Sequence, residues 1–243
     1  MDRYRMWSLI TLLMTALALQ GCAQQTQEGA SSASPEAAVS PAPEVRVEEA
    51  VEQTVAPAAA AVKKPSGSAF AGKKFFNIYT DGSAPDNHYA PSGWMGDYGD
   101  LKINTKHMDR PRSGSTSIQI VYNNKASQGQ RWAGIYWQNP PNNWGTLPGG
   151  YDLTGATKLT FWARGEKGGE RIEEFKLGGI SGNYADTDVA GIGPVVLTTE
   201  WQQFTIDLAD KDLTSISGGF CWATNLDVNP DGATFYLDDI RYE

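Results

Sequence analysis

The chain has 243 residues, of which 20% are charged, and its formal net charge at pH 7 is −8. Acidic residues outnumber basic ones, so this balance argues against nucleic acid and anionic lipid as partners. Neutral ligands fit the charge better than acidic ones.

Residues 1–21 have the pattern of a bacterial signal peptide. Arg3 and Arg5 precede an apolar run over residues 7–19, which is too short for a membrane span and suits an export signal. We therefore expect this segment to be removed from the mature protein.

The sequence Leu19-Gln20-Gly21-Cys22 resembles a bacterial lipobox, in which the cysteine is diacylated before cleavage. An ordinary signal peptide with an incidental cysteine is the alternative, but its cleavage site requires small residues at both flanking positions, and Leu19 is large. The resemblance implies a lipid anchor at Cys22 on the cell envelope, and Ala23 favours the outer membrane. With Cys22 lipidated, Cys221 has no disulfide partner.

Residues 22–69 are predicted to form a disordered tether that begins at the lipidated cysteine. Residues 23–68 consist mainly of Ala, Pro, Glu, Gln, Ser and Val and contain no aromatic residue, so they cannot build a core. As a flexible chain this segment would span roughly 40 Å on average. A segment that orders only against a partner is the alternative.

Residues 70–243 are predicted to form one all-β domain. All the phenylalanines and all but one of the tryptophans lie here, in short apolar runs separated by turn residues. The predicted strands cover residues 75–80, 116–122, 132–138, 158–164, 173–178, 202–208, 219–224 and 234–242. No long amphipathic helical pattern is present, so we expect a two-sheet antiparallel β-sandwich of the jelly-roll kind.

Alternation within these strands assigns side chains to the two faces. In residues 158–164 the apolar set faces the core, which leaves Trp162 and Arg164 outside. In residues 173–178 the outward side chains are Glu174 and Lys176. If these two strands share a sheet, the four residues form one patch able to bind a sugar, because an indole covers the apolar face of a pyranose while charged groups reach its hydroxyls. Alternatively, Trp162 covers a sheet edge or is buried under a loop.

The most aromatic segment covers residues 131–151. In its strand, Ala133, Ile135 and Trp137 are the better core candidates, which would expose Trp132 and Tyr136. The following loop, residues 139–150, carries Trp144 among prolines and asparagines, and such loops often bind ligands. Trp144 could instead plug the open end of the sandwich.

A second aromatic loop is predicted over residues 88–98 and contains Trp94. It could lie at the same end of the domain as the loop that carries Trp144. Trp94 is therefore included among the candidate sugar-binding residues.

The segments FFNIYTDG, KLTFWARG, WQQFTIDL and FYLDDIRYE together resemble jelly-roll carbohydrate-binding modules of the galactose-binding-like fold, family 11 among them. The resemblance covers roughly residues 74–243 and implies a non-catalytic domain that binds a glycan through aromatic residues. It also implies a structural calcium ion, for which Asp81, Asp238 and Asp239 are the matching residues, since calcium prefers oxygen ligands. Hydrogen-bonded carboxylates at strand ends are the alternative. Such modules are usually attached to a hydrolase, whereas this one follows a lipid tether.

An enzymatic function finds little support in the sequence. His88 and His107 lie in predicted loops and outside any nucleophile or zinc motif. Glu170, Glu173 and Glu174 could serve a glycosidase, but adjacent strand residues point to opposite faces. Cys221 shows no paired base and is expected to be buried and inert.

Two hypotheses remain from the sequence. In the first, the domain holds a polysaccharide to the cell envelope. In the second, the same aromatic surface binds a protein partner in an envelope assembly. A glycan site should show aromatic rings rimmed by polar groups in an open groove, and a protein interface a larger and flatter apolar patch.

Overall fold

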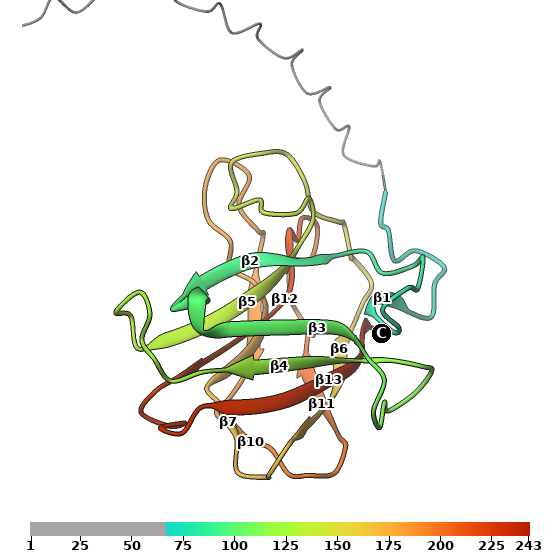
Figure 1. Cartoon of the computed structure of the whole chain (residues 1–243). Helices are drawn as coiled ribbons and strands as arrows, with labels where there is room; N and C mark the ends of the chain where they lie inside the picture. Colours follow the sequence, from blue (N-terminus) through green and yellow to red (C-terminus); the bar gives the residue numbers. More distant parts are fainter. Residues whose placement is uncertain (1–66) are drawn as a thin grey trace, which may run out of the picture. The chain divides into compact units, whose positions relative to one another are not determined.

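Short strands separated by turns make up most of the regular structure of residues 67–243, which are the residues that the computed structural model describes (Figure 1). The strands are β1 (Phe76–Tyr79), β2 (Ala90–Gly96), β3 (Leu101–His107), β4 (Ser117–Tyr122), β5 (Trp132–Gln138), β6 (Lys158–Gly165), β7 (Arg171–Ile172), β8 (Glu174–Gly178), β9 (Val189–Ile192), β10 (Val195–Val196), β11 (Gln202–Asp207), β12 (Gly218–Asn225) and β13 (Ala233–Tyr242). One 3-10 turn, η1 (Tyr98–Asp100), joins β2 to β3. The signal peptide, Cys22 and nearly all of the predicted tether lie outside the described residues.

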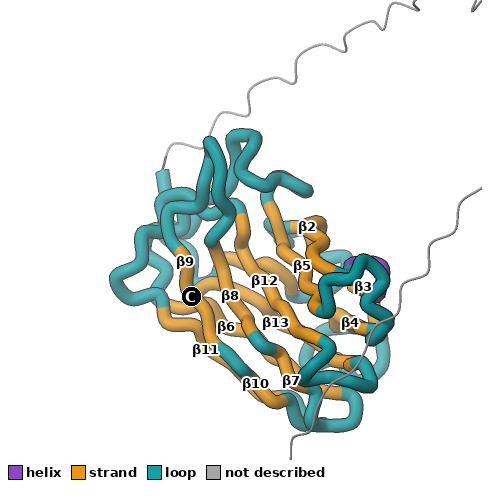
Figure 2. Tube along the Cα trace, turned by 90° about the vertical axis from the view of Figure 1, so that its left-hand side faces the viewer, coloured by secondary structure: helices purple, strands orange, loops and turns teal. Residues whose placement is uncertain are grey.

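The strands form two antiparallel sheets that face each other. Sheet A has the order β11-β6-β13-β4-β3, with β1 also paired to β13, and sheet B has the order β2-β5-β12-β8-β9. β7 and β10 form a separate pair. Figure 2 shows the strands of sheet B side by side in front of sheet A. The predicted two-sheet jelly-roll sandwich is confirmed.

The core lies between the sheets and is built by the alternation that the sequence predicts. Leu159, Phe161 and Ala163 of β6 are fully buried, as are Phe175 and Leu177 of β8. Burying each large apolar side chain stabilises the fold by roughly 1.5–3 kcal/mol. The outward side chains of each strand are therefore the ones left for ligands.

Each of the predicted strands is present, with ends that agree within two residues. The expectation of a loop over residues 88–98 is wrong, because β2 occupies most of it as an edge strand of sheet B. His107 likewise ends β3 instead of lying in a loop. No helix in residues 67–243 has the length and apolar character needed to cross a bilayer.

Candidate carbohydrate-binding groove

The central part of the candidate site is the outer face of β5. Ala133, Ile135 and Trp137 are buried in the core, as predicted, so Trp132 and Tyr136 lie on the opposite face of sheet B. The Trp132 side chain is 38% exposed, whereas Tyr136 is 5% exposed. Since a strand rises about 3.3 Å per residue, these two side chains stand about 13 Å apart along β5.

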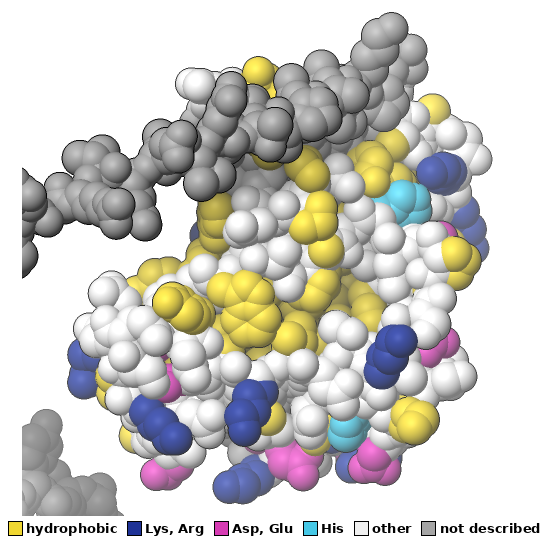
Figure 3. Space-filling model, turned by 45° about the horizontal axis from the view of Figure 1, so that its top comes forward, with side chains coloured by type: hydrophobic (Ala, Val, Ile, Leu, Met, Phe, Trp, Pro, Cys, Tyr) yellow, Lys and Arg dark blue, Asp and Glu magenta, His cyan; other side chains and the backbone are white. Residues whose placement is uncertain are grey.

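Small residues form the floor between them. Gly134 lies opposite Ala223 of β12, and Tyr136 lies opposite Cys221. A Cβ added at Gly134 would come within 2.9 Å of the terminal methyl of Met95, which covers this part of β5 from the edge strand β2. Gly134 and Cys221 are themselves buried, so Met95 and the partly exposed Ala223 provide the accessible apolar surface of the floor. Figure 3 shows a different feature: a hollow lined by hydrophobic side chains, with Lys and Arg side chains along its lower margin, on the side of the molecule where the edge strands β2 and β3 face the viewer in Figure 1.

Trp144 stands at one end of this floor. Its ring meets the Tyr136 ring edge-on, with centroids 5.8 Å apart, and its side chain is 38% exposed. The loop that carries it is held by the Gln138 side-chain amide, which donates to the Asn143 carbonyl at 3.0 Å. The Trp144 ring is therefore neither fully buried nor free of contacts, because it packs against Tyr136 and is otherwise exposed to solvent.

A second loop, residues 179–188, braces the Trp144 loop. The Tyr184 amide donates to the Gly145 carbonyl at 3.0 Å. Asp186 fixes the base of this loop by accepting the backbone amides of Ile180 and Gly218, and burial raises the pKa of its carboxyl. Sequence reasoning missed this loop because it contains no aromatic cluster.

Charged side chains border the groove on β8. Lys176 lies opposite Cys221, and its Nζ is 5.8 Å from the centroid of the Tyr136 ring. The same ammonium forms an ion pair with Glu174 at 2.7 Å. Both side chains are partly exposed, so a ligand on the floor can reach them.

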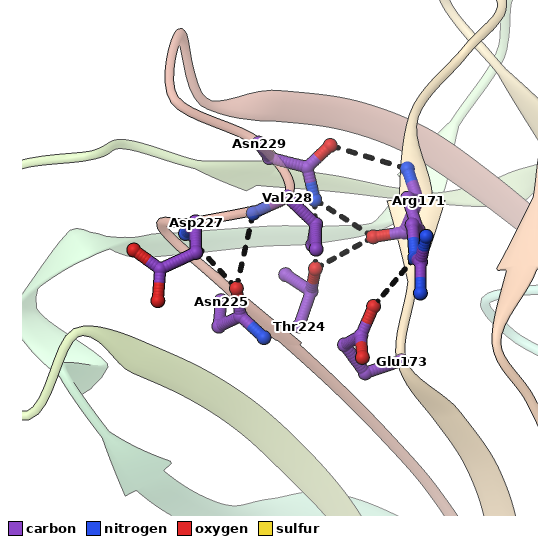
Figure 4. Close-up of polar contacts among 7 residues, drawn as sticks. All are labelled: Arg171, Glu173, Thr224, Asn225, Asp227, Val228 and Asn229. Atoms are coloured by element: carbon purple, nitrogen blue, oxygen red, sulfur yellow. Dashed lines mark hydrogen bonds and ion pairs between the residues drawn. The ribbon is translucent and has the colours of Figure 1, made fainter. Parts of the chain in front are cut away.

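The opposite end of the groove, beside Trp132, is held by a polar network (Figure 4). Asn225, which lies opposite Trp132, accepts the amides of Asp227 and Val228. The Asn229 side chain donates to the Arg171 carbonyl at 2.7 Å and ties this loop to β7. These contacts fix the backbone at the Trp132 end.

Trp162 and Arg164 do not join this group. Their strand, β6, belongs to sheet A, so the predicted patch with Glu174 and Lys176 does not form. The Arg112 guanidinium stacks over the Trp162 ring at 4.0 Å. Arg164 is buried against the Tyr236 ring, with 2% exposure, instead of pointing to solvent.

Trp94 also lies away from the groove. It is 38% exposed but pairs with Ile135, a core residue, whereas its neighbour Met95 pairs with Gly134 on the outer face. Trp94 therefore stands at the sheet edge on the side opposite the groove. Of the predicted sugar-binding residues, the structure brings together Trp132, Tyr136, Trp144, Glu174 and Lys176.

The residues predicted to bind calcium act here as hydrogen-bond acceptors. Asp81 accepts the Thr116 amide at 2.7 Å, and Asp238 accepts the Arg112 amide at 2.9 Å, so the two carboxylates hold opposite ends of one loop. No group of three His, Cys, Asp or Glu side chains within residues 67–243 is placed to hold a metal ion. Calcium binding by these three aspartates stays a prediction.

Alternation along the strand would place Asp239 in phase with the buried Phe235 and Leu237, pointing inward, but the structure does not show this orientation. A bulge in β13 between residues 238 and 241, with φ of 47° at Asp239, turns that side chain partly outward and buries Asp238 instead. Burial, together with the negative charge of Asp239, raises the pKa of Asp238 to about 7, although backbone amides partly offset the shift.

The three candidate glycosidase carboxylates lie in separate environments. Glu170 is buried and accepts the Lys167 amide, Glu173 pairs with Arg171, and Glu174 pairs with Lys176. Cys221 is buried and unpaired, as predicted, and burial raises the pKa of its thiol. The groove therefore presents rings, hydrogen-bonding groups and one ion pair, which are the elements of a binding surface.

No protein-family model matches the chain, and no curated protein sequence shows significant similarity to it. Solved structures similar to it are carbohydrate-binding modules. A family 30 module is 17% identical, covers 70% of this chain and 98% of its own length, and gives a TM-score of 0.49. A family 11 module from Clostridium thermocellum, in complex with a β-1,3-1,4-mixed-linked tetrasaccharide, is 15% identical. It covers 62% of this chain and 88% of its own length, with a TM-score of 0.42. A xylan-binding family 22 domain from Paenibacillus barcinonensis is 13% identical, covers 64% of this chain and 87% of its own, and gives 0.38. Similarity at this level transfers neither a ligand nor a binding residue.

Proposed function

We propose that this protein is a non-catalytic, lipid-anchored carbohydrate-binding protein of the bacterial cell envelope, which holds a polysaccharide in the groove on sheet B. One observation carries the proposal: two half-exposed indoles, Trp132 and Trp144, stand at either end of a low floor of small residues bordered by hydrogen-bonding groups. Indoles take up the apolar faces of sugar rings, and the floor leaves space for a chain between them.

The groove suits a glycan better than a protein partner. Its exposed apolar side chains are Trp132, Trp144 and Val189 of β9. The charged Glu174 and Lys176 of β8 lie between β5 and β9, whereas a stable protein interface needs a continuous apolar centre. Sugar hydroxyls both donate and accept hydrogen bonds, and the groove presents a carboxylate and an ammonium to match them.

Tryptophan substitutions test this proposal. We expect Trp132→Ala and Trp144→Ala each to weaken binding to a neutral polysaccharide by roughly two- to tenfold, because a ring that stacks on a sugar contributes about 0.5–1.5 kcal/mol. The measurement is a glycan array followed by affinity electrophoresis on the polysaccharides that bind. Trp162→Ala and Trp94→Ala are matched controls, since both remove an indole outside the groove.

The controls should bind as the wild type does, once circular dichroism shows that every variant is folded. Equal losses in the groove variants and the controls would contradict the groove as the site. A wild-type chain that binds no glycan, but captures an envelope protein through the same tryptophans, would favour the protein-interaction hypothesis.

A further inference from the structure

The cations that border the groove are each paired with an acid. Lys176 forms its ion pair with Glu174 at 2.7 Å, and Arg131, next to Trp132, pairs with Asp227 at 2.5 Å. Arg164, a cation predicted from the sequence to be among the sugar-binding residues, is buried on the outer side of sheet A. A ligand carboxylate in the groove would therefore meet neutralised cations.

Of these pairs, the one on β8 lies beside Tyr136, between the two tryptophans that mark the ends of the groove. Lys176 stands over the edge of the Tyr136 ring, which supports Trp144, and Glu174 lies two residues earlier on the same face, opposite Ala223 of the floor. The Lys176 side chain is 24% exposed and that of Glu174 is 44% exposed, so the pair is open to the groove.

The chemistry of this pair distinguishes hydroxyls from carboxylates. An ammonium has three donors, and after one serves Glu174 it can still donate to a ligand, while the carboxylate can only accept. A sugar hydroxyl accepts from Lys176 and donates to Glu174. A ligand carboxylate or sulfate cannot donate, and the negative charge of Glu174 repels it at short range.

We infer that Glu174 is a specificity-determining residue, which makes the groove select uncharged glycans and reject glycans bearing carboxylates or sulfates. The inference rests on the proposed function. A Glu174 that only formed an ion pair with Lys176 would affect stability and not ligand choice. A Glu174 that repels anionic ligands would change the relative affinity for charged and uncharged glycans when its carboxylate is replaced.

The test compares the full-length chain with Glu174→Gln, which keeps the size of the side chain and frees the charge of Lys176. The probes are a soluble glucan, a mannan and a galactan, each used intact and after oxidation of its C6 hydroxymethyl groups to carboxylates. We expect the wild type to prefer every intact polymer that it binds. In Glu174→Gln the affinity for the oxidised polymer should rise about fivefold relative to the intact one, and high salt should abolish the gain.

Glu200→Gln is the matched control. It removes the same charge from an exposed ion pair with Arg110, on the side of sheet A, and should leave the ratio of the two affinities unchanged. An equal rise in this control would show that net charge, and not Glu174, sets the preference.

The inference and the proposed function fail differently. If Trp132→Ala weakens binding but Glu174→Gln keeps the affinity ratio within about twofold of the wild type, or if the wild type already prefers oxidised polymers, the inference is overturned and the proposed function stands. If the wild type binds none of the polymers and no glycan on the array, the proposed function fails and the inference with it.

Discussion

Tyr136 supports the groove without presenting much surface to a ligand. Its ring meets Trp144 edge-on, and its hydroxyl donates to the Gly178 carbonyl at 3.0 Å. Beneath it lies a small apolar cluster with Ile180 and Cys221. The sequence predicted direct contact between Tyr136 and sugar, but a side chain that is 5% exposed acts mainly by positioning Trp144.

Tyr136→Phe separates these two roles. The variant keeps the ring but leaves the Gly178 carbonyl without its partner, so we expect the free energy of unfolding to fall by about 1–2 kcal/mol. Glycan affinity should change less than about twofold, because the indole remains supported. Urea denaturation and affinity electrophoresis measure the two effects. A large loss of affinity with unchanged stability would instead show that the hydroxyl contacts the ligand.

At the scale of elements, the bulge in β13 places Asp238 where its charge is unfavourable. The carboxylate is buried and accepts amides from Arg112, Ser113 and Asp239, and its pKa is raised to about 7. The folded state therefore holds this proton more tightly than the unfolded chain, whose aspartates titrate near 3.9. The stability that Asp238 contributes is full below about pH 4 and is lost as the pH rises toward 7.

We expect wild-type stability to decline between about pH 4.5 and 7.5 relative to Asp238→Asn, which cannot titrate. Thermal unfolding of both proteins over this range measures the difference. Because Asp81 and Asp238 serve as acceptors of loop amides, the decline should persist in millimolar calcium. A bound calcium ion would hold Asp238 ionised and abolish the decline, and that result would support the calcium site implied by the resemblance.

Alternation in the sequence predicted which side chains each strand buries, but it could not predict which strands become neighbours. Trp132 was placed on the correct face because β5 alternates regularly. Trp162 was grouped with Glu174 wrongly, because the pairing of β6 with β13 depends on contacts far apart in the chain. The edge strand β2 was not predicted because it contains Pro91 and two glycines, which are unfavourable in strands. The contribution of Met95 to the floor was therefore missed as well.

At the scale of the whole molecule, the groove needs only residues from the sandwich, whereas the proposed anchor depends on the N-terminal sequence. Removal of residues 1–21 leaves a formal net charge of −9 at pH 7. The mature protein therefore has little electrostatic attraction to anionic lipid. In the proposed function, acyl chains at Cys22 supply the attachment to the membrane, since two or more chains suffice for it.

Cys22→Ala tests this dependence. We expect the wild-type chain, produced in a bacterium, to sediment with membranes and to carry a diacylglyceryl group on Cys22 in mass spectra, because the lipobox directs modification before cleavage. Because cleavage follows diacylation, the alanine substitution is combined with an ordinary cleavable export signal in place of residues 1–21. This variant should leave the membrane fraction, since it keeps neither the acyl chains nor the apolar run over residues 7–19. Its soluble form should bind polysaccharide with unchanged affinity, because the groove lies wholly within the described sandwich. A variant that stays with the membrane would place the anchor elsewhere, and a wild type with unmodified Cys22 would reduce the lipobox to a chance match.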